Sequence, residues 1–167
     1  MNYKKISTKR EKEIAKDISG QRHVGSGNVW FKRGDASNEF LLIEDKFVIS
    51  DRYSIKLDII DKLTSQAHKQ GKLPILRFGF SNRSIFQNYA CIESCYCNQE
   101  AEVGSIMFYT SSKKSKTIKY NDLYAALTTF QGDPIVLKLV FYEERRTFYI
   151  IEWQDFLKSQ ENLIVSF

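Results

Sequence analysis

The chain has 167 residues, a formal net charge of +5 and an apolar content of 43%. This composition predicts a globular fold with its own core and excludes a disordered chain. No apolar run approaches the roughly 20 residues that a membrane span needs, and the polar N-terminal segment lacks a secretory signal. We therefore expect a cytoplasmic protein, whose positive charge favours a polyanionic partner.

The first predicted element is a helix that runs from Thr8 to about Ser19. Residues 8–11 fit the capping-box pattern S/T-x-x-E of a helix start, and Gly20 is expected to end the helix. At about 100° per residue, Glu11 falls on the apolar face of this helix with Ile14 and Ile18. An acid on that face either caps the helix or faces a functional site.

The next predicted elements are extended segments at residues 21–24 and 28–33, which flank the tight turn Gly25-Ser26-Gly27. Residues 39–48 predict a strand whose nearly continuous apolar run implies burial on both faces.

A helix over residues 57–70 is predicted by apolar residues at helical spacing, with Ser54 as a possible N-cap and Gly71 at its end. Its apolar positions are Leu57, Ile60, Leu63 and Ala67. A buried strand follows at residues 74–80. The order of helices and strands predicts an α/β (α+β) fold with a mixed central β-sheet flanked by helices.

The second half of the chain predicts a β-rich extension. Its expected elements are strands at 89–96 and 104–110, a helix at 120–129, a hairpin of 135–142 with 147–153, and a closing helix at 153–163. A Ser-rich loop carries the basic cluster Lys113, Lys114, Lys116 and Lys119. Because no Gly-, Ser- and Pro-rich linker separates the halves, we predict one domain over 1–167, with a core of about 8–80 and an extension of about 81–167.

Three cysteines, Cys91, Cys95 and Cys97, are an odd number in a chain without a secretory signal, so a disulfide framework is not expected. Their C-x3-C-x-C spacing lacks the paired CxxC of a zinc ribbon. Buried or half-buried thiols are the favoured interpretation.

Candidate chemistry is concentrated around the 39–48 strand. Glu44 and Lys46 project to one face of that strand and Asp45 to the other, while Asp35 lies just upstream. Two carboxylates are hard ligands for Mg²⁺, and a nearby ammonium can orient a water or stabilise developing charge. The alternative is a surface-turn aspartate followed by an ordinary Glu–Lys pair where the strand meets solvent.

The order of these features resembles the PD-(D/E)XK nuclease superfamily, and within it the archaeal-type and phage-encoded Holliday-junction resolvases. The matching elements are "EKEI" at residues 11–14, the Gly-Ser-Gly turn, Gly34-Asp35 and Ile43-Glu44-Asp45-Lys46. The resemblance covers residues 8 to about 80. It implies a restriction-endonuclease-like core and a cytoplasmic DNA-recombination enzyme of a bacterial, archaeal or phage source.

The resemblance also implies roles for individual residues. Asp35 and Glu44 would be metal ligands, with the Asp45 backbone carbonyl completing the site, and Lys46 would position the nucleophilic water. Glu11 would contribute to metal or phosphate binding, and Ser26 would contact the DNA backbone. The ion would be Mg²⁺, which Mn²⁺ can replace. Basic residues expected to contact DNA are Lys9, Arg10, Arg22, Lys62, Lys113, Lys114 and Lys116.

The sequence departs from the family pattern in three ways. Arg33 or Gly34 occupies the position of the motif's proline, although that proline is not general in these families. Asp45 stands where an apolar residue is usual between the glutamate and the lysine, and residues 81–167 exceed a minimal resolvase. The expected function is therefore a Mg²⁺-dependent junction-selective endonuclease acting as a homodimer. A sequence-specific restriction or homing endonuclease on the same fold and a non-catalytic DNA-binding module stay open as alternatives.

Overall fold

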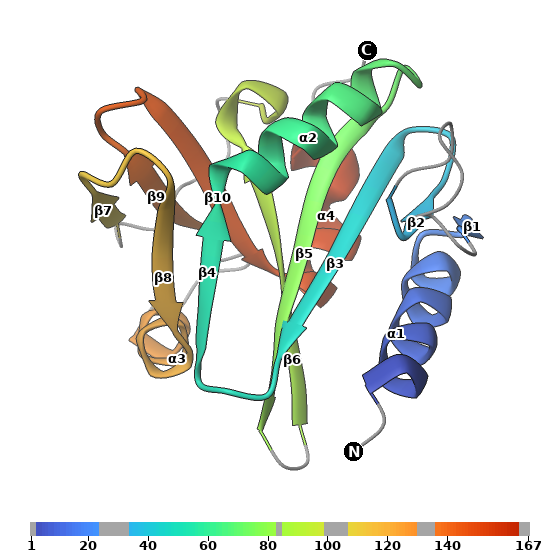
Figure 1. The fold of residues 1–167 in the computed structure, drawn as a ribbon, viewed down its shortest axis with the longest axis horizontal. Helices are drawn as coiled ribbons and strands as arrows, with labels where there is room; N and C mark the ends of the chain where they lie inside the picture. Colours follow the sequence, from blue (N-terminus) through green and yellow to red (C-terminus); the bar gives the residue numbers. More distant parts are fainter. Residues whose placement is uncertain (1–2, 24–33, 83–84, 99–106, 130–135, 164–167) are drawn as a thin grey trace. The chain divides into compact units, whose positions relative to one another are not determined.

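The computed structural model describes residues 3–23, 34–82, 85–98, 107–129 and 136–163 (Figure 1). Its helices are α1 (Tyr3–Asp17), α2 (Leu57–His68), α3 (Tyr120–Thr129) and α4 (Trp153–Leu163), with a short 3-10 helix at Ser94–Tyr96. Its strands are β1 (Gln21–Arg22), β2 (Ala36–Ser37), β3 (Leu41–Val48), β4 (Arg52–Lys56), β5 (Leu73–Asn82), β6 (Ile85–Glu93), β7 (Met107–Thr110), β8 (Ser115–Lys119), β9 (Val136–Phe141) and β10 (Arg146–Glu152).

Within these ranges, eight strands form one sheet in the order β1-β2-β3-β5-β6-β10-β9-β7, and β4 and β8 form a separate two-stranded sheet. Strand β7 pairs with β9 in parallel, whereas β10 is antiparallel to both β6 and β9. The sheet is therefore mixed, as the sequence predicts. No helix of the described part is both long and apolar enough to cross a membrane.

The chain divides into two compact units. One consists of Met1–Asp45 with Ile59–Leu76, and the other of Lys46–Asp58 with Arg77–Phe167. These boundaries do not coincide with the predicted core and extension, and the single-domain organisation stays a prediction.

In the first unit, α1 lies against β1 and β2. One buried stripe at a spacing of four residues is formed by Arg10 and Ile14 of the helix and by Ile18 directly after its end. The helix begins at Tyr3, so the predicted capping box was wrong. Thr8 and Glu11 lie inside the helix, where the backbone N–H groups already have partners one turn earlier.

The end of α1 combines two unusual backbone requirements. Ser19 adopts a left-handed conformation with φ of 50°, and Gly20 donates its N–H to the Ala15 carbonyl at 2.7 Å, which is a Schellman-type ending. Gly20 is needed for space, because a Cβ added there would lie 2.3 Å from the Ser37 carbonyl oxygen on β2.

Substitutions at these neighbouring positions are expected to act in opposite directions. Gly20→Ala should destabilise the fold by about 1–3 kcal/mol because the added methyl group forces α1 away from β2. Ser19→Gly should stabilise it, or at least cost nothing, because glycine adopts positive φ without a Cβ clash. Chemical denaturation of both variants tests this. Equal effects of the two changes would contradict the assigned roles.

The strand and helix that follow agree with their sequence patterns. Leu41, Leu42 and Ile43 of β3 are all buried, although neighbouring residues of a strand face opposite sides, so both faces are covered here. The four predicted apolar positions of α2 are also buried, and Gly71 ends the turn with φ of 62°. Ser54 is not the N-cap of α2, since it lies within β4.

The second unit contains the three antiparallel strands β6, β10 and β9, in that order in the sheet, and α4 packs on β6 and β10. The predicted β9–β10 hairpin and the closing helix are confirmed. The part of the 104–110 strand from Met107 onward is confirmed as β7, and its first residues lie outside the described ranges. Strand β8 occupies much of the predicted Ser-rich loop, and its partner β4 was also missed.

Candidate functional site

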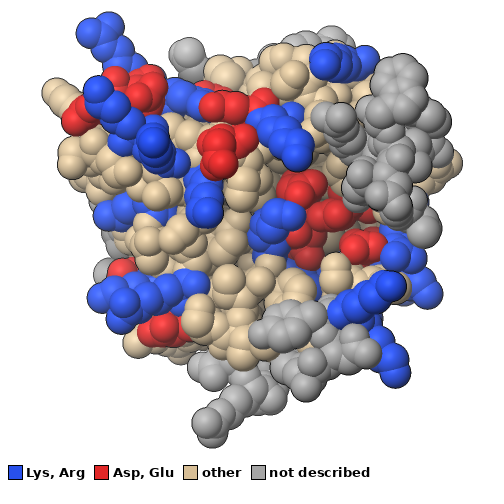
Figure 2. All heavy atoms as spheres, in the orientation of Figure 1, with Lys and Arg blue, Asp and Glu red and all other residues tan. Residues whose placement is uncertain are grey.

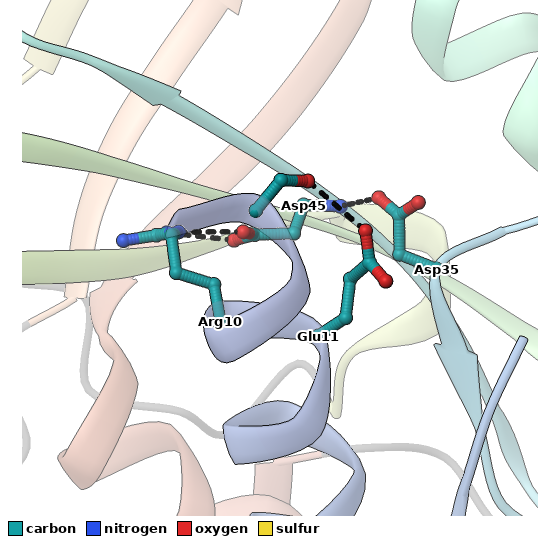
Figure 3. Close-up of polar contacts among 5 residues, drawn as sticks. Arg10, Glu11, Asp35 and Asp45 are labelled. Atoms are coloured by element: carbon teal, nitrogen blue, oxygen red, sulfur yellow. Dashed lines mark hydrogen bonds and ion pairs between the residues drawn. The ribbon is translucent and has the colours of Figure 1, made fainter. Parts of the chain in front are cut away.

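A buried ion pair joins α1 to the Glu44-Asp45-Lys46 segment of β3 (Figure 3). The Arg10 guanidinium donates from Nε and from a terminal nitrogen to the two Asp45 carboxylate oxygens, each at 2.7 Å. The side chains are only 3% and 4% exposed. This bidentate contact explains why an aspartate stands at position 45, because its carboxylate neutralises the buried Arg10. It also fixes β3 against α1.

Arg10 was predicted to contact DNA, but its guanidinium is buried and engaged with both carboxylate oxygens of Asp45. The sequence contained a signal for this burial. Arg10 precedes Ile14 and Ile18 at a spacing of four residues, on the stripe that faces the interior.

Asp35 lies beside the same segment of β3. Its carboxylate oxygen Oδ2 accepts the backbone N–H of Asp45 at 2.8 Å, and its own N–H donates to the Ile43 carbonyl at 2.8 Å. Ala36 is the register partner of Ile43, so Asp35 and Ala36 both face one residue of β3, an arrangement typical of a β-bulge. Gly34, with φ of 89°, provides the bend into this arrangement.

Glu11, one residue after Arg10 on α1, is also engaged with protein donors. Ser7 Oγ donates to its Oε1 at 3.0 Å, and Arg22 Nε donates to its Oε2 at 2.7 Å. The Glu11 and Arg22 side chains are 16% and 23% exposed. In the view of Figure 3, the Glu11 and Asp35 carboxylates extend toward the same region, one from α1 and one from the segment before β2.

Glu44 and Lys46 flank Asp45 along β3, and both are half-buried. The Asp45 side chain is directed to Arg10 on α1. Because side chains alternate along a strand, Glu44 and Lys46 project to the opposite face from Asp45, as the sequence predicts.

The predicted metal ligands Asp35 and Glu44 are both carboxylates, the type of ligand that a hard divalent cation prefers. Among the described residues, no group of three or more His, Cys, Asp or Glu side chains is placed to hold a metal ion. Mg²⁺, however, typically takes one or two protein carboxylates and completes its shell with waters and substrate phosphates. Asp35 and Glu44 supply that number. Asp45 contributes no side-chain ligand because Arg10 holds both its oxygens, and its backbone carbonyl stays a predicted ligand.

The remaining predicted site residues are distributed over several elements. Ser26 lies outside the described residues. Lys9 on α1 and Lys62 on α2 are exposed, as is Lys114 before β8. Lys113 Nζ lies 3.3 Å from a Glu143 oxygen, and Lys116 Nζ donates to the Tyr109 carbonyl at 3.0 Å. On the face drawn in Figure 2, acidic side chains lie among the basic ones.

The cysteines are free thiols, with Cys91 and Cys97 buried and Cys95 exposed. Burial raises the pKa of the Cys91 thiol well above its usual range and raises the pKa of Cys97 to about 12. Both thiols are therefore protonated at neutral pH. The burial of Cys91 and Cys97 agrees with the predicted buried or half-buried thiols, whereas Cys95 is exposed.

Comparisons with known proteins assign no family to this chain. No protein-family model matches it, and no curated protein is significantly similar to it.

Proposed function

We propose that this protein is a metal-dependent DNA endonuclease of the PD-(D/E)XK type, selective for four-way junctions. The observation that carries the proposal is the hydrogen bond between Asp35 Oδ2 and the Asp45 N–H. This bond links Asp35, the aspartate of the PD-(D/E)XK pattern, to Asp45, the middle residue of Glu44-Asp45-Lys46. Such a contact supports the interpretation that the spaced acids form one site.

In this proposal Asp35 and Glu44 hold Mg²⁺, or Mn²⁺ in its place. When bound, the ion supplies Lewis-acid stabilisation of charge on the phosphate and lowers the pKa of water. The Asp45 N–H fixes the Asp35 carboxylate in one orientation, which reduces the reorganisation needed on binding.

Lys46, a half-buried residue on the Glu44 face, is the proposed positioning group for the attacking water, since its ammonium can donate hydrogen bonds and offset negative charge. Glu11 is proposed to act at the edge of the site. Any contact of Glu11 with a metal would require it to exchange its ion pair with Arg22. Ser26 keeps its proposed contact with the DNA backbone.

A homodimer is proposed because the symmetric cleavage of a junction needs two active sites related by a twofold axis. A sequence-specific endonuclease and a non-catalytic DNA-binding module are the competing functions.

Cleavage of matched substrates distinguishes these functions. Wild-type protein is incubated with Mg²⁺ and either a synthetic four-way junction or a linear duplex that contains the sequences of its arms. We expect paired incisions in the junction and an intact duplex. Incision of the duplex at a fixed sequence would instead support the sequence-specific enzyme. Binding of both substrates without any incision would support the non-catalytic module and overturn the proposal.

A further inference from the structure

The β4–β8 ribbon carries an outward face that no predicted site residue occupies. Its two strands lie side by side in antiparallel register (Figure 1). Tyr53, Ile55 and Ile118 point inward and are buried. The alternate positions point outward and are Arg52, Ser54, Lys56, Ser115, Thr117 and Lys119. They comprise three cations and three hydroxyls, without an acid.

The orientation of this face is fixed by contacts on the inner side and at both ends of the ribbon. The Tyr53 ring stacks on Phe78 with centroids 5.0 Å apart. At one end Leu57 donates its N–H to the Lys114 carbonyl at 2.9 Å, and at the other Tyr120 donates to the Asp51 carbonyl at 2.8 Å. These contacts fix the backbone of the ribbon, so Arg52, Lys56 and Lys119 stay on its outward face.

The outward face places like charges directly opposite each other. Arg52 is the register partner of Lys119, and cross-strand pairs of like charge destabilise a sheet. Asp51 lies 3.8 Å from Arg52, but both side chains are more than 60% exposed, so solvent screens most of that attraction. Between the cationic ends, Ser54 Oγ and Thr117 Oγ1 are 2.7 Å apart. The pairing of Arg52 with Lys119 is unfavourable in the protein alone, and it becomes favourable when a bound anion contacts both cations.

We propose that the outward face of the β4–β8 ribbon binds the sugar–phosphate backbone of double-stranded DNA. The choice of DNA as the ligand rests on the proposed function. Arg52 and Lys56 are four residues apart on an extended strand, or about 13 Å. This separation is comparable to the roughly 12 Å width of the DNA major groove. The cations at the two ends of the ribbon thus contact phosphates on both sides of the groove, and the central hydroxyls face into it.

The test compares two variants with the same loss of charge. The ribbon variant is Arg52→Gln/Lys56→Gln/Lys119→Gln, and the control is Lys16→Gln/Lys69→Gln/Lys158→Gln, at basic positions outside the ribbon. Affinity for a short blunt-ended duplex is measured in EDTA over a range of salt concentrations. We expect the ribbon variant to bind about tenfold more weakly or worse, with the slope of log K against log salt reduced by about 0.9 for each lost phosphate contact. The control should retain most of the affinity and slope.

A second readout separates a binding role from a structural one. Arg52→Gln alone should raise the midpoint of thermal unfolding, because it removes the like-charge pair, while it weakens duplex binding. A lower midpoint together with weaker binding would indicate a structural role and overturn the inference. Equal affinity and slope in the ribbon and control variants would also overturn it. So would a ribbon variant that loses binding to phosphatidylserine vesicles but keeps its affinity for the duplex.

The duplex-binding measurement does not depend on whether the protein cleaves DNA, so it tests the ribbon inference separately from the endonuclease proposal. If the ribbon variant loses duplex binding and the wild type cleaves no DNA with Mg²⁺, the ribbon inference stands and the endonuclease proposal fails. If the wild type cleaves but the ribbon variant binds normally, the endonuclease proposal stands and the ribbon inference fails.

Discussion

Replacement of Arg10 with alanine is expected to lower the free energy of unfolding by about 3–5 kcal/mol. The change leaves the Asp45 carboxylate buried without its bidentate partner, and an uncompensated buried charge is costly. It also removes the contact between α1 and β3. That contact positions Glu11, on the helix, relative to Asp45, on the strand. Urea denaturation followed by circular dichroism measures the loss.

Two variants control for this interpretation. Lys9→Ala lies on the exposed side of the same helix and should leave the free energy of unfolding nearly unchanged. The double variant Arg10→Met/Asp45→Leu should recover most of the stability, because apolar side chains of similar volume often replace a buried ion pair without loss. If Arg10→Ala were no less stable than Lys9→Ala, the ion pair would not stabilise the fold.

Replacement of Glu44 with glutamine is expected to slow DNA cleavage on the order of 10³-fold with little effect on folding. The amide keeps the size of the side chain but lacks the negative charge that a Mg²⁺ ligand provides. A bound metal contributes several kcal/mol to transition-state stabilisation, and about 4 kcal/mol corresponds to three orders of magnitude in rate. The measurement is the single-turnover rate of junction cleavage at saturating protein.

Glu39→Gln is the matched control, since Glu39 is an exposed acid shortly before β3. It removes the same charge and should cleave at the wild-type rate. Cleavage by Glu44→Gln at the rate of an active wild type would remove Glu44 from the proposed site.

Much of the fold was predictable because its elements follow local apolar patterns. The helix α2 was recognised from four apolar positions at helical spacing, all of which are buried. Strands β3 and β5 were recognised from apolar runs with burial on both faces. The start of α1 was missed because a capping-box match at Thr8 and Glu11 outweighed the helix-compatible residues before it. Short motifs of this kind occur inside helices by chance.

The β4–β8 ribbon was missed for a different physical reason. Each strand has five residues, and β8 contains one apolar side chain, so the local pattern is weak. Its stability depends on pairing between residues 59 to 67 positions apart and on Tyr53 packing against Phe78. Tertiary contacts of this kind leave little trace in a local window of sequence.

The candidate site was only partly predictable. The proximity of Asp35 to the Glu44-Asp45-Lys46 segment followed from the expected strand order. The Arg10–Asp45 ion pair did not, because it joins residues 35 positions apart and depends on how α1 packs against β3. The helical stripe that Arg10 shares with Ile14 and Ile18 indicated burial but could not identify the partner.

The Mg²⁺ dependence of junction cleavage by the wild-type protein tests the central claim most directly. We expect incision of a four-way junction at a rate that rises with Mg²⁺ concentration, is supported by Mn²⁺ and is absent in EDTA. A junction that is bound but stays intact at saturating Mg²⁺ would contradict the claim, as would incision that proceeds equally in EDTA.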